Sequence, residues 1–432
     1  MHTSLKSCTF PIADISGLKK KVLNWLRPFS TFCFLDNQQY SIAPHSAECL
    51  VAAGVRQWVS GDDIRAADDL FLKEQWLFGH LSYALKDNLH SLPSGKEDRV
   101  GFPPYYFFSP LVVMELKDSV ITIHAADPEH VFAQLMEQPD QKHEAPLSIA
   151  EPMPVLSREE YIAKIRYLQA DILRGDCYEI NFCQEFFATG VELEPFAVFE
   201  NLMDVSPNPF SAFYRLENSY LLCASPERFL AKRGSRLISQ PIKGTSRRDT
   251  ENPGNDEKLR DAMKKSQKEQ SENVMIVDLV RNDLTQVCKP ASVQVDELFG
   301  IYTFPQVHQM ISTVSGELAE DTPFSAIIEA TFPMGSMTGA PKRSVMKLID
   351  ETEPSARGIF SGSVGYKAPN GDFDFNVVIR SVMYNQRSGY LSYQVGSGIT
   401  FYSDAEKEWE ECMLKAEAIK KVLTANPPAP LA

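Results

Sequence analysis

The chain has 432 residues, of which 44% are hydrophobic and 23% charged, an ordinary composition for a soluble globular protein with ample material for a core. Its formal net charge of −14 argues against nucleic acid or an anionic membrane as the main partner. The eight cysteines include no CxxC pair, which argues against a zinc or thioredoxin-like motif and favours free thiols in a reducing compartment.

The start of the chain, Met1 to Phe10, lacks the charged-then-apolar pattern of a signal peptide. No uninterrupted apolar run reaches the length needed to span a membrane. We therefore expect a cytoplasmic protein.

Predicted elements divide the chain into three parts. Short apolar runs at 31–35 and 105–108 predict strands within a first region, 1–140, which also contains helical stretches. A polar, proline-bearing stretch over 141–156 is typical of a linker. A second region covers 157–425.

The second region alternates strands and helices. Ser157, followed by Arg-Glu-Glu, predicts a helix N-terminus, and 219–242 predicts successive strands. A long helical stretch begins near Asn255, and 359–398 predicts an antiparallel meander with Asn370-Gly371 as its hairpin turn. Hairpin-linked strands interrupted by helices predict an α+β fold.

The last helix is predicted from Ser403, where Glu406 completes a capping box, to about Asn426. Just before it, Gly396-Ser397-Gly398 points at the positive end of that helix. Earlier, 332–342 mixes glycines with small hydroxyl side chains. Both segments suit a backbone that donates N–H groups to an anion, although each alone is more typical of a plain turn.

Lys243 in the segment Pro-Ile-Lys-Gly-Thr (241–245) is the strongest single candidate for chemistry. The segment places an amine at the end of a β-like run, just before a glycine turn. Such an amine is nucleophilic when burial or nearby cations depress its pKa, and Arg247 and Arg248 are close enough in sequence to supply those cations. The alternative is a solvated turn lysine beside two solvated arginines.

Two acidic pairs have the spacing of one helix face. Glu269 and Glu272 lie three residues apart on the long helical stretch, and Glu408 and Glu411 repeat the spacing on the last helix. Facing each other, they would hold one hard divalent cation with open positions, which suits Mg²⁺. The alternative is a solvated face, with Glu411 and Lys415 as an ordinary ion pair.

Taken together, these segments resemble the chorismate-utilising enzymes, the family that includes the anthranilate, isochorismate and salicylate synthases. Six matching segments occur in the family order and cover about 157–423. They are Gly175–Asn181, the Pro241–Thr245 segment, Met275–Leu284, Met334–Lys342, Asn376–Arg380 and the closing Gly396–Lys415 stretch. The resemblance implies a large antiparallel β-sandwich flanked by helices, shared by both regions of the chain.

The resemblance also implies a branch of the family. Anthranilate, isochorismate and salicylate synthases usually carry alanine where this chain has Lys243, whereas a lysine is typical of the branch that converts chorismate and ammonia to 4-amino-4-deoxychorismate, a precursor of p-aminobenzoate and folate. Lys243 would attack the ring and expel its hydroxyl, and ammonia would then displace the lysine. Glu179, where other members carry a water-activating lysine or a glutamine, would accept a proton from incoming ammonium.

The remaining site residues are implied by position in the matching segments. Those implied for magnesium are Glu272 and Glu411, with Glu269 and Glu408 in support. Those implied for chorismate and its carboxylates are Gly244, Thr245, Ser336, Tyr366, Arg380, Gly396, Ser397, Gly398 and Lys415. These cations and the metal would offset the acidic net charge at the site.

The implied partners are chorismate, ammonia and a separate glutamine amidotransferase subunit. Two departures from the family stand out: Gln309 replaces a family histidine, and Phe34-Leu35-Asp36-Asn37 lacks the serine of a tryptophan-binding motif. Two alternatives remain open, an anthranilate synthase component I, and a non-catalytic regulatory subunit that binds chorismate or an amino acid.

Overall fold

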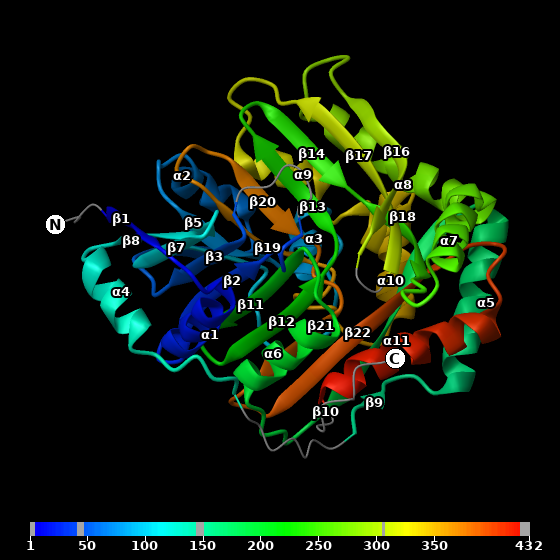
Figure 1. The fold of residues 1–432 in the computed structure, drawn as a ribbon. Helices are drawn as coiled ribbons and strands as arrows, with labels where there is room; N and C mark the ends of the chain where they lie inside the picture. Colours follow the sequence, from blue (N-terminus) through cyan, green and yellow to red (C-terminus); the bar gives the residue numbers. More distant parts are fainter. Residues whose placement is uncertain (1–4, 41–46, 144–150, 305–306, 424–432) are drawn as a thin grey trace.

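Two large antiparallel sheets organise the protein, seen here in a computed structural model that describes residues 5–40, 47–143, 151–304 and 307–423 (Figure 1). In order across the first sheet, sheet A, the strands are β1 (Lys6–Pro11), β8 (Val120–Ala125), β7 (Val112–Lys117), β3 (Cys49–Ala53), β2 (Thr31–Asp36), β11 (Phe210–Leu216), β12 (Ser219–Ser225), β21 (Ser381–Asn385), β22 (Tyr390–Ile399), β10 (Glu179–Ala188) and β18 (Gly339–Ala340), with β9 (Met153–Pro154) beside β10.

The second sheet, sheet B, stacks on sheet A. Its strands, in order, are β15 (Ile242–Arg247), β17 (Val307–Glu317), β14 (Arg236–Gln240), β13 (Arg228–Arg233), β20 (Phe373–Asn376), β19 (Ser363–Lys367), β5 (Leu77–Leu81), β6 (Tyr105–Ser109) and β4 (Gln57–Gly61), with β16 (Gln294–Thr303) beside β17.

The helices lie mainly on the outside of the two sheets (Figure 1). They are α1 (Ile15–Leu26), η1 (Ile64–Ala67), α2 (Asp68–Phe71), η2 (Tyr83–Leu85), α3 (Lys86–Leu89), α4 (Pro128–Met136), α5 (Arg158–Arg174), α6 (Pro195–Val205), α7 (Pro253–Lys265), α8 (Gln267–Thr285), α9 (Phe324–Thr331), η3 (Gly335–Met337), α10 (Lys342–Thr352) and α11 (Ala405–Leu423). None of those in the described ranges has the length and apolarity to cross a bilayer.

Strand β2 shows how the core is layered. Successive side chains of a strand point to opposite faces, so Phe32 and Phe34 enter the layer between sheet A and its outer helices, and Cys33 enters the layer between the two sheets. Because both faces are covered, the strand is apolar almost throughout, which explains the strong signal at 31–35.

Strands from the first and second regions of the chain share both sheets. In sheet A, β2 pairs with β11, and in sheet B, β5 pairs with β19. The expectation of an α+β antiparallel sandwich shared by both regions is therefore confirmed, whereas the exact region boundaries remain a prediction.

Three local predictions need correction. The long helical stretch is two helices, because Ser266 ends α7 and caps α8 by accepting from the Glu269 N–H. The last helix is capped by Asp404 rather than Ser403, since the Asp404 carboxylate accepts from the backbone of Glu406 and Lys407 at 3.0 and 3.2 Å. Its predicted end at Asn426 lies outside the described residues.

The third correction concerns the meander over 359–398. The Asn370-Gly371 turn does join β19 to β20, and Gly371 has a φ of 85°. However, β19 and β20 belong to sheet B, while β21 and β22 belong to sheet A. The chain crosses between the sheets at 377–380, so Arg380 stands at the crossover with a φ of 51°. The helix N-terminus predicted at Ser157, in contrast, is present, and Ser157 and Glu160 form a capping box there.

Candidate active site

Lys243 lies in a β-bulge near the start of β15, just beyond the end of β14. The pairing of β15 with β17 shifts register so that Lys243 and Gly244 together face Met310. Gly244 has a φ of 94°, and a Cβ there would lie 2.8 Å from Oε2 of Glu269. The predicted glycine turn is therefore wrong, since β15 continues to Arg247; glycine is needed for the left-handed backbone and the close approach to α8.

The Lys243 side chain reaches from sheet B to the first residue of β10 in sheet A. Its Nζ donates to Oε1 of Glu179 at 2.5 Å, and the two side chains are only 12% and 2% exposed. Gly398 of β22 makes room for the pair, because a Cβ there would lie 2.9 Å from the Glu179 oxygen and 3.1 Å from the lysine nitrogen. A buried amine and carboxylate thus lie directly against the backbone of the segment 396–398.

The lysine is cationic in the free protein. Burial lowers the pKa of Lys243, but the carboxylates of Glu179, Glu272 and Glu227 outweigh burial and leave the pKa raised. The expectation of a depressed pKa is therefore wrong for the ligand-free state. The proton must leave before this amine can act as a nucleophile.

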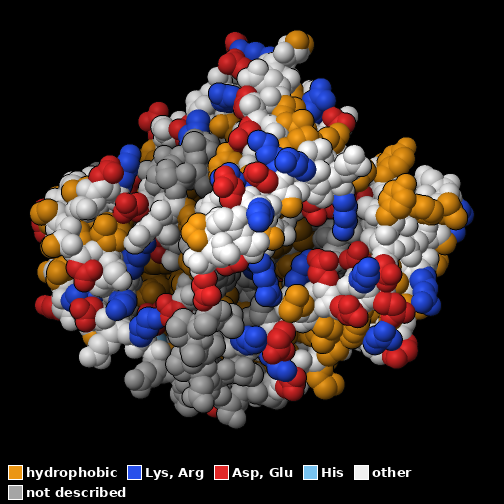
Figure 2. Space-filling model, turned by 45° about the vertical axis from the view of Figure 1, so that its right-hand side comes forward, with side chains coloured by type: hydrophobic (Ala, Val, Ile, Leu, Met, Phe, Trp, Pro, Cys, Tyr) orange, Lys and Arg blue, Asp and Glu red, His pale blue; other side chains and the backbone are white. Residues whose placement is uncertain are grey.

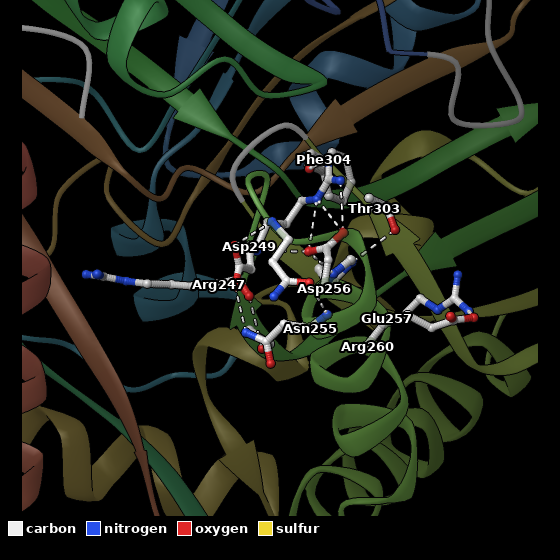
Figure 3. Close-up of polar contacts among 12 residues, drawn as sticks. Arg247, Asp249, Asn255, Asp256, Glu257, Arg260, Thr303 and Phe304 are labelled. Carbon is white, nitrogen blue, oxygen red and sulfur yellow. Dashed lines mark hydrogen bonds and ion pairs between the residues drawn. The ribbon is translucent and has the colours of Figure 1, made fainter. Parts of the chain in front are cut away.

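The two arginines expected to depress that pKa do not neighbour Lys243. Arg248 donates to Asp256 of α7, with Nη2 at 2.9 Å, and to the carbonyl of Phe304 at 3.2 Å; Arg247 is exposed and extends away from this cluster (Figure 3). His308 completes the network, its Nε2 3.0 Å from Asp256. Hydrogen bonds from Arg248 chiefly, opposed by burial, hold the pKa of Asp256 near 2.

Glu227 is a site residue that the sequence prediction missed. It lies in the two-residue corner between β12 and β13 and is 5% exposed. Burial raises the pKa of its carboxyl to about 7, against the opposing effects of the Ser336 hydroxyl, the Lys243 ammonium and the guanidinium of Arg380. The available signal was an acidic residue in a short corner between two strands whose central residues, 220–224 and 229–231, are apolar.

Glu227 also links two residues that the sequence did predict. Arg380 stands at the crossover between the sheets, where burial lowers its pKa and the charge of Glu227 opposes that effect. Ser336 lies in η3, is 9% exposed, and faces the same carboxyl. Lys243, Arg380 and Ser336 therefore all act on one buried carboxyl group, whose pKa burial raises to about 7.

The acidic pair on α8 borders the same site. Burial raises the pKa of Glu272 to about 7; Lys243 and Lys268 oppose the rise, and Glu179 and Glu269 add to it. Lys268 also lowers the pKa of Glu411 on α11. Lys268 lies 3.9 Å from Oε1 of Glu272, so the same ammonium acts on both carboxyls, and the predicted facing pair of Glu272 and Glu411 remains a prediction.

The other members of the acidic pairs, Glu269 and Glu408, have different neighbours. Glu269 abuts the bulge at Gly244, and Glu408 is buried beside Tyr161 of α5. Glu411 forms the ordinary ion pair with Lys415, 2.7 Å, and Lys415 also donates to the carbonyl of Gly396 at 3.1 Å. No group of three or more His, Cys, Asp or Glu side chains that would hold a metal occurs in the described ranges.

A Mg²⁺ ion nonetheless fits the chemistry of Glu272. Burial raises the pKa of Glu411, but the Lys415 ammonium, with that of Lys268, outweighs burial and leaves the pKa lowered, so Glu411 offers a second, ionised carboxylate. A carboxyl whose pKa is raised by burial and by neighbouring acids gains stability when a dication takes the place of its proton. Magnesium binds through one or two carboxylates and keeps several waters or substrate oxygens, so two protein ligands satisfy it.

The remaining predicted residues occupy different settings. Thr245 is exposed and Ser397 is buried in β22. Tyr366 lines a cavity of about 80 Å³ between the sheets, together with Leu35 and Asn376. Their predicted substrate contacts remain predictions.

Surface charge is mixed on the face shown in Figure 2, where acidic and basic side chains are interspersed. The formal net charge of −14 is therefore not gathered into one acidic surface on that face. An anionic ligand would meet the local cations Arg380, Lys243 and Lys415 rather than a uniform negative field.

Comparison with known families agrees with this arrangement. Residues 25–421 match the model of the chorismate binding enzyme family. The chain belongs to that family.

Within the family, the chain is similar in sequence to two relatives with different names. The aminodeoxychorismate synthase component 1 of Klebsiella aerogenes is 40% identical over 264 residues, which are 61% of this chain and 58% of the relative. The anthranilate synthase component I-like protein of a Synechocystis strain is 32% identical over 354 residues, 81% of this chain and 72% of the relative. The matched part thus spans less than two thirds of the Klebsiella protein.

Solved structures show the same fold. The crystal structure of anthranilate synthase component I from Streptococcus pneumoniae superposes with a TM-score of 0.75 at 23% identity, covering 88% of this chain and 94% of that one. At this identity the likeness concerns the fold.

Proposed function

We propose that this protein is an aminodeoxychorismate synthase component I, which converts chorismate and ammonia to 4-amino-4-deoxychorismate through a covalent bond to Lys243. One observation carries the proposal: a buried lysine amine 2.5 Å from a buried carboxylate, in a member of the chorismate binding enzyme family. A lysine is both a competent nucleophile and, once protonated, a leaving group, which suits replacement of a hydroxyl by an amine.

The first step is a proton transfer within the pair. Lys243 donates its proton to Glu179, whose Oε1 already accepts the hydrogen bond. The product is a neutral amine beside a neutral acid. Burial favours this neutral pair, and the carboxylates that keep the lysine cationic in the free protein oppose it, so the transfer belongs to the substrate-bound state. The second carboxylate oxygen, Oε2, is buried without a hydrogen-bond partner and remains available to a ligand donor.

Glu227 supplies the acid for the next step. As the amine nitrogen bonds to the ring, the ring C–O bond breaks and the hydroxyl takes the Glu227 proton, leaving as water. With a pKa near 7, this carboxyl is protonated in a large share of molecules at neutral pH. Ammonia then bonds to the ring carbon that lost oxygen, the lysine C–N bond breaks, and the lysine regains a proton from the attacking ammonia. Glu179 releases the proton that it took from the lysine and Glu227 takes one up, which restores the starting protonation state.

Substrate placement follows from the surrounding cations. Arg380, beside Glu227, would hold the pyruvyl carboxylate, and the backbone of 396–398 would assist. Lys415, at the Gly396 carbonyl, would contact the other carboxylate. Mg²⁺ would be held by Glu272 and Glu411, with Glu269 and Glu408 in support, and would neutralise the ring carboxylate and draw electron density from the ring.

Ammonia would come from a glutamine amidotransferase subunit, and the product would feed p-aminobenzoate and folate synthesis. The Klebsiella relative is named as a component 1, which supports a two-component assembly. Eight cysteines without disulfides fit a reducing compartment such as the cytoplasm.

Product analysis tests the proposal. The purified chain is incubated with chorismate, a magnesium salt and an ammonium salt. We expect an amine product that an added lyase converts to p-aminobenzoate. Fluorescent anthranilate without the lyase would instead identify an anthranilate synthase component I, and chorismate binding without turnover would identify a regulatory subunit.

A further inference from the structure

Among the residues that the structure describes, one edge of β10, the strand that begins with Glu179, has no strand neighbour over part of its length. On one side β22 pairs with it continuously. On the other side β18 pairs only with Glu179 and Ile180, and β9 only with Phe186 and Phe187. Because this edge is buried, its backbone groups require other partners.

Two side chains of one short segment supply part of those partners. After α10 ends, Oε1 of Glu353 accepts from the backbone N–H of Cys183 at 2.8 Å, and Nη2 of Arg357 donates to the carbonyl of Asn181 at 2.8 Å. Glu353 thus supplies an acceptor and Arg357 a donor to backbone groups two residues apart on β10. A neighbouring strand would supply an acceptor and a donor in the same way. The pair therefore replaces a missing strand beside the residues that follow Glu179.

The pair is internally rigid. Nε and Nη2 of Arg357 grip the Glu353 carboxylate at 2.9 and 2.6 Å, and the two side chains are 1% and 3% exposed. This bidentate fork fixes the plane of the guanidinium, which a lysine ammonium would not do.

The same guanidinium reaches the loop that carries Ser336. Its Nη1 donates to the carbonyl of Met337, the next residue, at 2.6 Å. One planar group thus connects Asn181, two residues beyond Glu179, to Met337, one residue beyond Ser336. It adds to the direct backbone bonds between these segments, which are the β10–β18 pairing and the bond from the Asn181 N–H to the Thr338 carbonyl at 2.7 Å. Arg357 thus braces the strand that begins with Glu179 against η3, which carries Ser336.

Fold stability alone does not account for this arrangement. Buried ion pairs are often neutral in stability when compared with apolar residues of similar volume, so a sandwich of this size does not need one here. What apolar residues cannot provide is the simultaneous placement of two backbone segments by one group.

We propose that Glu353 and Arg357 are a positioning pair for the chemical step. The inference rests on the proposed function, in which Glu179 takes the lysine proton and Glu227 supplies the acid. Loosening the pair leaves chorismate binding largely intact and misaligns these two proton transfers.

The test compares Arg357→Lys with Arg233→Lys. Arg233, in β13, also donates to a carboxylate, Asp374 at 2.8 Å, and to a carbonyl, that of Phe373 at 2.9 Å, so it receives the same substitution outside the pair. We expect Arg357→Lys to lower kcat about 10- to 100-fold with KM for chorismate within about threefold, and Arg233→Lys to change neither.

A second readout needs no turnover. Competitive acetylation of the free protein with acetic anhydride, followed over pH by peptide mass spectrometry, reports the midpoint at which Lys243 becomes reactive. In Arg357→Lys we expect this midpoint to fall, because Glu179 is no longer held against the lysine. Unfolding curves of both variants show whether each remains folded; should Arg357→Lys fail to fold, Glu353→Gln, which keeps an acceptor for Cys183, takes its place with the same expectations.

The outcomes separate the two proposals. A Lys243 midpoint and kcat equal to those of the parent protein in a folded variant would overturn the positioning role. Should the parent protein produce no amine at all, the proposed function fails, and the acetylation midpoint alone decides whether the pair positions Glu179.

Discussion

Charged clusters lie at the two ends of β15, and the pKa values of their carboxyl groups are shifted in opposite directions. At the bulge, Lys243 and its acidic neighbours are buried, and two carboxyls, Glu227 and Glu272, have pKa values raised to about 7. Just beyond the other end, Arg248 and its neighbours satisfy Asp256 so fully that its pKa is about 2 (Figure 3). In the first cluster, carboxyls with raised pKa values can give up or take a proton during binding and reaction. The second cluster anchors α7 to sheet B.

Of the substitutions in the two clusters, Lys243→Ala is expected to have the largest effect on activity. Loss of the amine removes the covalent route, so amine formation from chorismate should fall at least about 10³-fold. The measurement is product formation with ammonium and magnesium, together with a thermal unfolding curve. Arg247→Ala, an exposed residue of the same strand, is the control and should stay within about twofold. Retained turnover in a folded Lys243→Ala protein would remove the covalent step.

Glu227→Gln should have the next largest effect. The amide cannot donate a proton as an acid, so kcat should fall about 10²- to 10³-fold. In the parent protein kcat/KM should decline as pH rises through about 7, because Glu227 loses its proton there, and the variant should lack this decline. A pH–rate profile with the same decline in the variant would reassign the acid.

Glu227 also makes a prediction about stability. Its carboxyl holds a proton more tightly in the folded protein than in the unfolded chain, where the pKa is 4.5, so stability should fall as pH rises from 4.5 towards 7. The shift corresponds to about 3 kcal/mol. Urea unfolding at pH 4.5 and pH 7 measures the loss of unfolding free energy over this range, which should be smaller for Glu227→Gln than for the parent protein. Equal losses in the two proteins would contradict the burial of a protonated Glu227.

Glu272→Gln tests whether this carboxylate of the first cluster binds Mg²⁺. A neutral amide binds Mg²⁺ weakly, so the magnesium concentration for half-maximal activity should rise at least about 10-fold. A magnesium titration of the rate measures this. Glu257, an exposed acid of α7, provides the control variant Glu257→Gln, for which an unchanged titration is expected. An unchanged titration for Glu272→Gln would rule out this ligand.

The smallest effect on activity is expected from Asp256→Asn. The substitution removes the ion pair with Arg248, so the unfolding midpoint should fall while kcat stays within about threefold. The folded pKa lies below the unfolded value of 3.8, so the stability from Asp256 is present above about pH 4 and is lost as pH falls towards 2. A kcat loss comparable to that of Glu227→Gln would show that the two ends of β15 are not separate.

Sequence patterns predicted the fold and much of the site because they carry local periodicity and family resemblance. The apolar run at 31–35 and the helix N-terminus at Ser157 are local, and both are present in the structure. Family resemblance predicted Lys243, Glu179 and Arg380 as site residues. In the structure Lys243 donates to Glu179, and Lys243 and Arg380 both lower the pKa of Glu227 against its burial.

The failures have a common physical origin in tertiary geometry. Arg248 is close to Lys243 in sequence, but the strand and the contact with Asp256 carry its side chain elsewhere. Glu227 lies in a corner without periodicity, and its importance arises only where two sheets and a crossover meet. Likewise, the crossover at 377–380 divides what resembled a single meander.

The interleaving of β2 and β5 with later strands has a practical consequence for dissecting this protein. A fragment that starts near residue 157 would leave the sides of β11 and β19 uncovered, inviting aggregation through unsatisfied strand edges. Truncation is thus unsuited to separating any regulatory role of the early region from catalysis, whereas co-expression of two complementary pieces that reassemble would keep every ladder intact.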